Sequence, residues 1–96
     1  MADNGRIMAL HPDPKKQGTR IDREKYEQIK AAILDAIGEA REIAFGMLAE
    51  AVESRLTAPF DGSIGWYTTT VKLDLEARGF IEQVPGKRPQ HLRLAG

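Results

Sequence analysis

A helical run that ends at a glycine, followed by two short apolar runs around a turn, constrains the fold of this 96-residue chain most strongly. The run covers about residues 64–78, with Ser63 placed to cap its start and Gly79 to take a left-handed conformation at its end. After it, FIEQV and HLRLA have the length and apolar content of strands, and PGKRPQ separates them. The pattern predicts a helix and then a β-hairpin.

Two more helices and a short strand are predicted upstream of this unit. From Asp22, apolar residues recur at three- and four-residue steps, and Gly38 marks a stop. Leu48, Val52 and Leu56 step by four and predict the second helix. The order helix, strand, helix, helix, strand, strand predicts an α+β fold in which three helices pack on a small antiparallel sheet. The upstream elements are a helix over about 22–38, a strand over 42–45 and a helix over 46–56.

The N-terminal segment has a different character from the rest of the chain. Residues 1–21 contain two prolines and two glycines and show no periodicity, which is typical of an arm outside the domain. The apolar group Ile7, Met8 and Leu10 would let such an arm lie against the domain. We therefore expect a flexible or partly docked arm over 1–21 and one domain over 22–96.

Composition narrows the function classes without selecting one. Hydrophobic residues make up 42% and charged residues 29% of the chain, as in ordinary globular domains. No apolar run approaches the ~18 residues of a membrane span, and no signal peptide is apparent, so a cytoplasmic protein without a membrane partner is expected. The absence of cysteine excludes disulfides and thiolate metal sites. Fourteen basic and fourteen acidic residues cancel, although both ends are basic and the middle is acidic.

The boundary LEARGFIEQ, together with the order of elements, resembles the winged helix-turn-helix domain. In that family the third helix commonly ends with a leucine, a few polar residues, a glycine and an apolar pair that starts the wing. Leu75, Gly79, Phe80 and Ile81 carry the match, which covers about residues 22–95. The stretch WYTTTVKLDLEARG also resembles small uncharacterised bacterial proteins of this fold. The resemblance implies that the third helix enters the DNA major groove and that residues 87–91 of the wing contact the backbone or minor groove.

The predicted third helix is poorly equipped to read DNA. Its core stripe leaves an opposite face of Trp66, Thr69, Leu73 and Glu76, with Lys72 at the edge. Base reading relies on Arg, Lys, Asn and Gln, and a carboxylate repels phosphate. We expect at most weak, salt-sensitive binding by a DNA-binding or transcription-associated regulator, a hypothesis that rests on analogy of fold. The predicted nucleic-acid contacts are Thr68, Thr69, Lys72, Lys87, Arg88 and His91.

The same helix supports a second hypothesis from a different class. An exposed Trp66 beside Leu73 is the kind of anchor found in protein interfaces, which predicts a protein-interaction module, either a homodimer or an adaptor. The alternative is that this apolar stripe is covered by the chain itself, through the apolar group of the arm or through Phe60. Both interpretations stay open at the level of sequence.

The sequence offers little for catalysis or metal binding. His11 lies in the arm and His91 in the predicted hairpin, far apart in the sequence. Neither has another histidine or a cysteine at the spacing of metal ligands. The sequence contains no glycine-rich loop of the kind that binds phosphate and no arrangement of Ser, His and Asp typical of a catalytic triad. We therefore predict no enzymatic activity, no cofactor and no metal.

Overall fold

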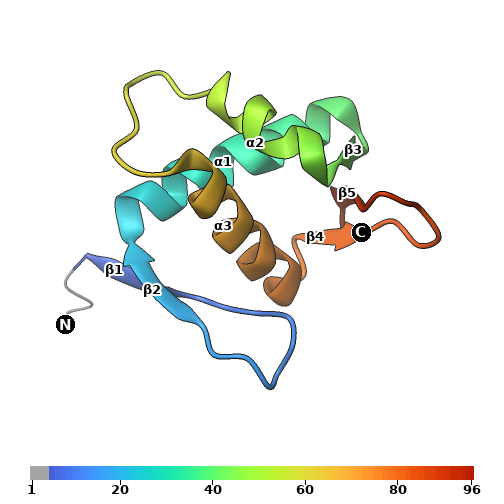
Figure 1. The fold of residues 1–96 in the computed structure, drawn as a ribbon, viewed down its shortest axis with the longest axis horizontal. Coiled ribbons are helices and arrows are strands. Elements are labelled where there is room, and N and C mark those ends of the chain that lie inside the picture. Colours follow the sequence, from blue (N-terminus) through green and yellow to red (C-terminus); the bar gives the residue numbers. More distant parts are fainter. Residues whose placement is uncertain (1–4) are drawn as a thin grey trace.

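The computed structural model describes residues 5–96 and contains three helices and two small antiparallel sheets (Figure 1). This arrangement confirms the predicted α+β class with three helices and a small antiparallel sheet. Residues 1–4 of the predicted arm lie outside the described residues. The elements in chain order are β1 (Arg6–Ala9), β2 (Thr19–Asp22), α1 (Arg23–Ala40), β3 (Ile43–Ala44), α2 (Phe45–Glu53), α3 (Ile64–Arg78), β4 (Ile81–Gln83) and β5 (His91–Leu94).

Local chemistry accounts for the ends of the helices. Asp22 caps α1 by accepting a hydrogen bond from the Lys25 N–H at 3.0 Å. Ser63 caps α3 in the same way through the Trp66 N–H, and Gly79 ends it with φ 83°. The predicted stop at Gly38 is wrong, because α1 continues to Ala40 and ends at the left-handed Arg41. Helix α2 ends at Glu53, three residues before its predicted end.

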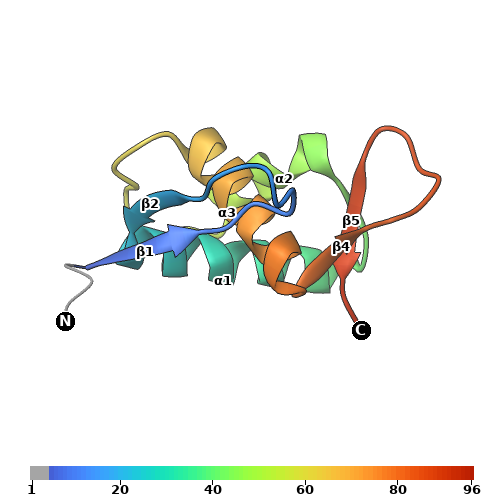
Figure 2. The same cartoon turned by 90° about the horizontal axis from the view of Figure 1, so that it is seen from below.

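The core lies where α1, α2 and α3 meet the three-stranded sheet, whose strand order is β3-β5-β4. Ile33, Leu48, Leu75 and Leu92 come from four different elements, and none of them is exposed to solvent. Complete burial of each such side chain contributes about 1.5–3 kcal/mol to folding. Figure 2 shows α1 as the lower layer, with β4 and β5 toward one end of the molecule and the N-terminal strands toward the other. No helix within residues 5–96 has the length and apolar content to cross a bilayer.

The expected arm forms a docked β-hairpin. Strands β1 and β2 pair antiparallel, with Ile7 opposite Ile21 and Met8 opposite Arg20. Ile21 and Ala9 are buried against the helices, whereas Met8 and Arg20 point outward and are exposed. The absence of periodicity in residues 1–21 predicts no regular structure for this segment. The hairpin therefore adds a second, two-stranded sheet to the predicted order of elements.

Gly18 allows the two strands of the hairpin to approach each other. A Cβ atom at this position would lie 2.4 Å from the carbonyl oxygen of Ala9, a distance that no side chain tolerates. The close approach requires a residue without a side chain.

Candidate functional site

Helix α3 lies between α2 on one side and the β1–β2 hairpin on the other (Figure 1). Val71 and Leu75 face the core and are fully buried. The helix therefore presents three further sides: one toward α2, one toward the hairpin, and one toward solvent. The predicted site residues of α3 lie on two of these sides: Thr68 and Lys72 toward α2, and Trp66, Thr69 and Leu73 toward solvent.

The side toward α2 is polar and buried. Lys72 is 4% exposed, and its Nζ lies 3.3 Å from Glu76 Oε1 and 4.7 Å from the centre of the Phe45 ring. The contact with Glu76 is an ion pair without hydrogen-bond geometry, since Oε1 makes no hydrogen bond within residues 5–96. The other carboxylate oxygen, Oε2, accepts a hydrogen bond from Gln83 Nε2 at 3.0 Å. The ammonium group is thus held inside the molecule by an acid and an aromatic ring.

This burial contradicts the prediction that Thr68 and Lys72 contact DNA. Thr68 is 1% exposed and lies one turn before Lys72, on the same side of the helix. Helix α2 packs against this side of α3. The buried part of the helix circumference is therefore wider than the apolar stripe from which burial was predicted. Neither side chain is accessible to a duplex.

The side toward the hairpin is organised by Asp74, whose side chain is fully buried. Its carboxylate accepts hydrogen bonds from the Tyr26 hydroxyl, from Arg78 Nε at 2.8 and 3.0 Å, and from the Leu10 N–H at 2.8 Å. Arg78 also donates through Nη2 to the carbonyl oxygen of Met8 at 3.1 Å. One carboxylate thus joins α1, α3 and β1. The hairpin is fixed beside α3 by charge-assisted hydrogen bonds as well as by apolar packing.

The same contacts shift two pKa values. Burial, followed by the hydrogen bond to Asp74 and its negative charge, raises the pKa of Tyr26 well above its usual value of 10.0. The hydrogen bond to Asp74 raises the pKa of the Arg78 guanidinium. Tyr26 is therefore a neutral donor and Arg78 a cation at neutral pH.

We expect the contribution of Tyr26 to the free energy of unfolding to fall in alkaline solution. The folded pKa is raised, so the stabilisation is complete below the unfolded value of 10.0 and is lost as the pH rises from there toward the folded pKa. The loss is about 1.4 kcal/mol per pH unit, because only the unfolded chain releases this proton. Urea unfolding of the wild type and of Tyr26→Phe should give a free-energy difference that changes little between pH 9 and 10 and by about 1.4 kcal/mol in total between pH 9 and 11, because the full slope is reached only above the unfolded pKa of 10.0. Parallel pH profiles would contradict the assignment.

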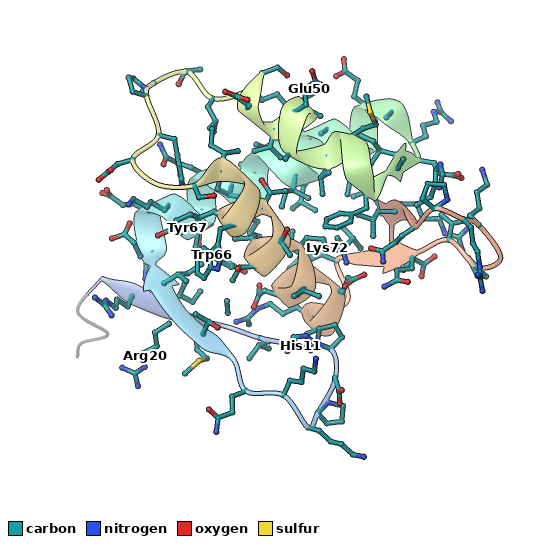
Figure 3. The ribbon with its side chains drawn as sticks, viewed as in Figure 1. His11, Arg20, Glu50, Trp66, Tyr67 and Lys72 are labelled. Carbon is teal, nitrogen blue, oxygen red and sulfur yellow. The ribbon has the colours of Figure 1, made fainter. Side chains whose placement is uncertain are left out.

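The side of α3 toward solvent carries no charge. It consists of Trp66, Thr69, Leu73 and Ala77, which we call the outer face. Trp66 is 48% exposed, Thr69 and Ala77 are exposed, and Leu73 is partly buried. Figure 3 shows Trp66 beside the N-terminal half of α3, whereas Lys72 lies farther along the helix. The predicted outward position of Glu76 is wrong, because that side chain turns toward Lys72 and Gln83.

The chain itself leaves Trp66 48% exposed. Phe60 packs edge-on against Tyr67 with ring centres 5.2 Å apart, and the Trp66 ring lies 4.9 Å from that of Tyr67. The hairpin docks on the Asp74 side of α3 and leaves Met8 and Leu10 themselves 42% and 38% exposed. The alternative in which the arm or Phe60 completes a second core is therefore not what the structure has.

The basic turn between β4 and β5 is largely neutralised by local acids. Lys87 Nζ lies 2.5 Å from Glu42 Oε2, and the hydrogen bond from this lysine lowers the pKa of Glu42. Arg93 pairs with Glu82 across the strands at 2.6 Å. His91 is partly buried, and its Nδ1 lies 2.8 Å from the carbonyl oxygen of Pro89. Of the three nucleic-acid contacts predicted here, Lys87, Arg88 and His91, Arg88 is the one that is exposed and has no ion-pair partner within residues 5–96.

Neither a metal centre nor a charged ligand site emerges elsewhere in the described chain. Residues 5–96 contain no group of three or more His, Asp or Glu side chains placed to hold a metal ion. His11 instead accepts a hydrogen bond from the Asp13 N–H at 3.0 Å. An open hollow between α1 and the end of α2 contains Arg55, but Asp35 and Glu39 already pair with this guanidinium and raise its pKa. The hollow has no free cation for an anionic ligand.

Comparison with known proteins places the chain in a family. A family model described as a family of unknown function, DUF6958, matches residues 6–92. The chain belongs to the DUF6958 family. No match was found among curated proteins or among solved structures. The matched span of DUF6958 begins at the first residue of β1, so it includes the hairpin as well as the three helices. The docked hairpin is thus part of the unit that defines the family.

Proposed function

We propose that this chain is a protein-interaction module that binds its partner through the outer face of α3. The observation that carries the proposal is the half-exposed indole of Trp66 on a side of the helix that has no charged residue. Tryptophan is among the residues that contribute most to binding at interfaces, and the centres of interfaces are depleted of charge. An aromatic ring left open to water on a small domain is best explained by a partner that covers it.

The apolar surface continues from α3 onto β1. Met8 and Leu10 are exposed, and the backbone groups of both residues bond to α3, through Arg78 and Asp74 respectively. Both residues therefore lie on the flank of α3 that carries Asp74 and Arg78, next to the outer face in the order of the elements. A surface that combines one helix with a neighbouring strand has more area than a single helical stripe, as a specific protein contact requires.

The geometry favours a protein partner over DNA. Of the six predicted nucleic-acid contacts, two are buried, Lys87 is paired with Glu42 and His91 is partly buried. Thr69 and Arg88 are exposed and have no ion-pair partner within residues 5–96, and a single guanidinium supplies only one phosphate contact. Binding to a duplex through this set would be weak and would disappear at moderate salt.

A photo-crosslinking amino acid at Thr69 tests the proposal in the cells that make the protein. Thr69 is exposed at the centre of the outer face, so a bound partner lies within reach of the reactive group. We expect a crosslinked product that contains protein, and we expect Trp66→Ala to abolish it. Glu27 of α1 is exposed on a different helix and provides the matched control position, which should give no product.

Two results of this experiment would reject the proposal. A product that is degraded by nuclease and contains no second polypeptide would show that nucleic acid covers the outer face. If the chain with the photo-crosslinking amino acid at position 69 is present at the wild-type level and gives no crosslinked product, the outer face has no stable partner.

A further inference from the structure

The two sides that flank the outer face carry opposite charge. Residues 5–22 of the hairpin hold four basic residues and two acidic ones, a net charge of +2, whereas α2 holds two acidic residues and no basic one, a net charge of −2. Figure 3 shows Arg20 and Glu50 at opposite edges of the molecule, with Trp66 between them. Neither side chain has an ion-pair partner within residues 5–96. The outer face is therefore an uncharged strip between a basic edge and an acidic edge.

Resting on the proposed function, we infer that the partner on the outer face is a second copy of this chain. A partner of one sign would be attracted by one edge and repelled by the other. A second copy carries both signs and the same uncharged strip. The whole chain has a net charge of +0, so no overall repulsion opposes its association with itself.

Symmetry decides how the two copies face each other. In a two-fold dimer the same surface contacts itself. If the two-fold axis lies parallel to α3, the hairpin of one copy faces α2 of the other, since the two elements lie on opposite sides of the helix (Figure 1). If the axis lies across α3, basic hairpin faces basic hairpin and acidic α2 faces acidic α2. Charge selects the first arrangement, with the two α3 helices parallel and Trp66 of each copy near the axis.

Charge reversal at each edge tests this arrangement in purified full-length protein. The hairpin variant carries Lys16→Glu and Arg20→Glu, and the α2 variant carries Glu50→Lys and Glu53→Lys, all at exposed positions. We expect the wild type to sediment as a dimer and each variant alone to dissociate, with a dimer dissociation constant raised at least about tenfold. Mixing the two variants should restore a dimer, because each hairpin then faces an α2 of opposite sign.

Two controls separate this register from general attraction. The hairpin variant has a net charge of −4 and the α2 variant a net charge of +4, because each carries two reversals and each reversal changes the net charge of +0 by two units. A second pair with the same net charges, Arg41→Glu with Arg88→Glu and Glu24→Lys with Glu27→Lys, lies outside the two edges, and each of these chains should dimerise alone. The chain that carries all four edge reversals is neutral again, and it should dimerise as the wild type does.

The outcomes distinguish this inference from the proposed function. A wild type that stays at the monomer mass of 10.6 kDa at all concentrations would overturn the inference, and the Thr69 crosslink to a different protein would still support the proposed function. A dimer that Trp66→Ala dissociates and that the edge reversals leave intact would overturn the parallel arrangement. A dimer insensitive to both would place self-association on another surface and reject the inference.

Discussion

Replacing Asp74 with alanine is expected to lower the free energy of unfolding by about 2–4 kcal/mol. The substitution leaves the buried Tyr26 hydroxyl and the partly buried Leu10 N–H without an acceptor. It also removes the counter-charge of Arg78, whose side chain is 34% exposed and therefore keeps part of its hydration. Urea unfolding at neutral pH measures the loss. Hydrogen exchange at the Leu10 amide should show in addition that the hairpin opens before the rest of the fold.

The control for Asp74→Ala is the removal of an exposed carboxylate. Glu27→Ala on α1 should change stability by no more than about 0.5 kcal/mol, as expected for a surface position. The triple variant Tyr26→Phe, Asp74→Leu, Arg78→Met removes the polar partners together and should recover part of the loss. If Asp74→Ala unfolds with the wild-type midpoint and the Leu10 amide keeps its protection, Asp74 does not fix the hairpin.

Replacing Glu76 with leucine is expected to destabilise the protein by about 3–5 kcal/mol, because the Lys72 ammonium stays buried without its counter-ion. Lys72 and Glu76 have side chains that are 5% and 7% exposed, so water does not compensate for the lost partner. The Phe45 ring retains a smaller attraction for the cation. Chemical unfolding of Glu76→Leu measures the effect.

The double variant Lys72→Met, Glu76→Leu tests the cause of that loss. Without a buried charge, two apolar side chains of similar volume should bring the stability back to within about 1.5 kcal/mol of the wild type. A double variant that is as unstable as Glu76→Leu would show that the loss comes from packing and from the Gln83 hydrogen bond, and not from the isolated ammonium.

Features encoded within a few residues were predictable from the sequence, and features set by contacts between distant segments were not. Helix α3 has its predicted bounds because Ser63 and Gly79 supply the chemistry of both ends. The short strands β1 and β2 have no such local signal. They enclose a loop with two prolines, and β1 and the residue after it are bonded to residues of α3 that lie more than sixty positions away.

The candidate site was predicted in part for the same reason. Periodicity identified the apolar stripe of α3 and therefore placed Trp66 on the opposite side, where the structure has it half exposed. Periodicity does not reveal how much of the helix circumference other elements cover. Helix α2 covers Thr68 and Lys72 on one flank, and the hairpin covers Asp74 on the other. An acid and a base four residues apart have the pattern of a solvated pair, yet Asp74 and Arg78 form the junction of three elements.

The bond between Leu10 and Asp74 joins positions 64 residues apart, and this separation orders the events of biosynthesis. At roughly 5–20 residues per second, translation takes about 3–13 s to make the second position after the first. During this time α3, the helix to which Met8 and Leu10 bond, is not yet present. Strand β1, which is synthesised before α3, therefore reaches its final place only after α3 has been made.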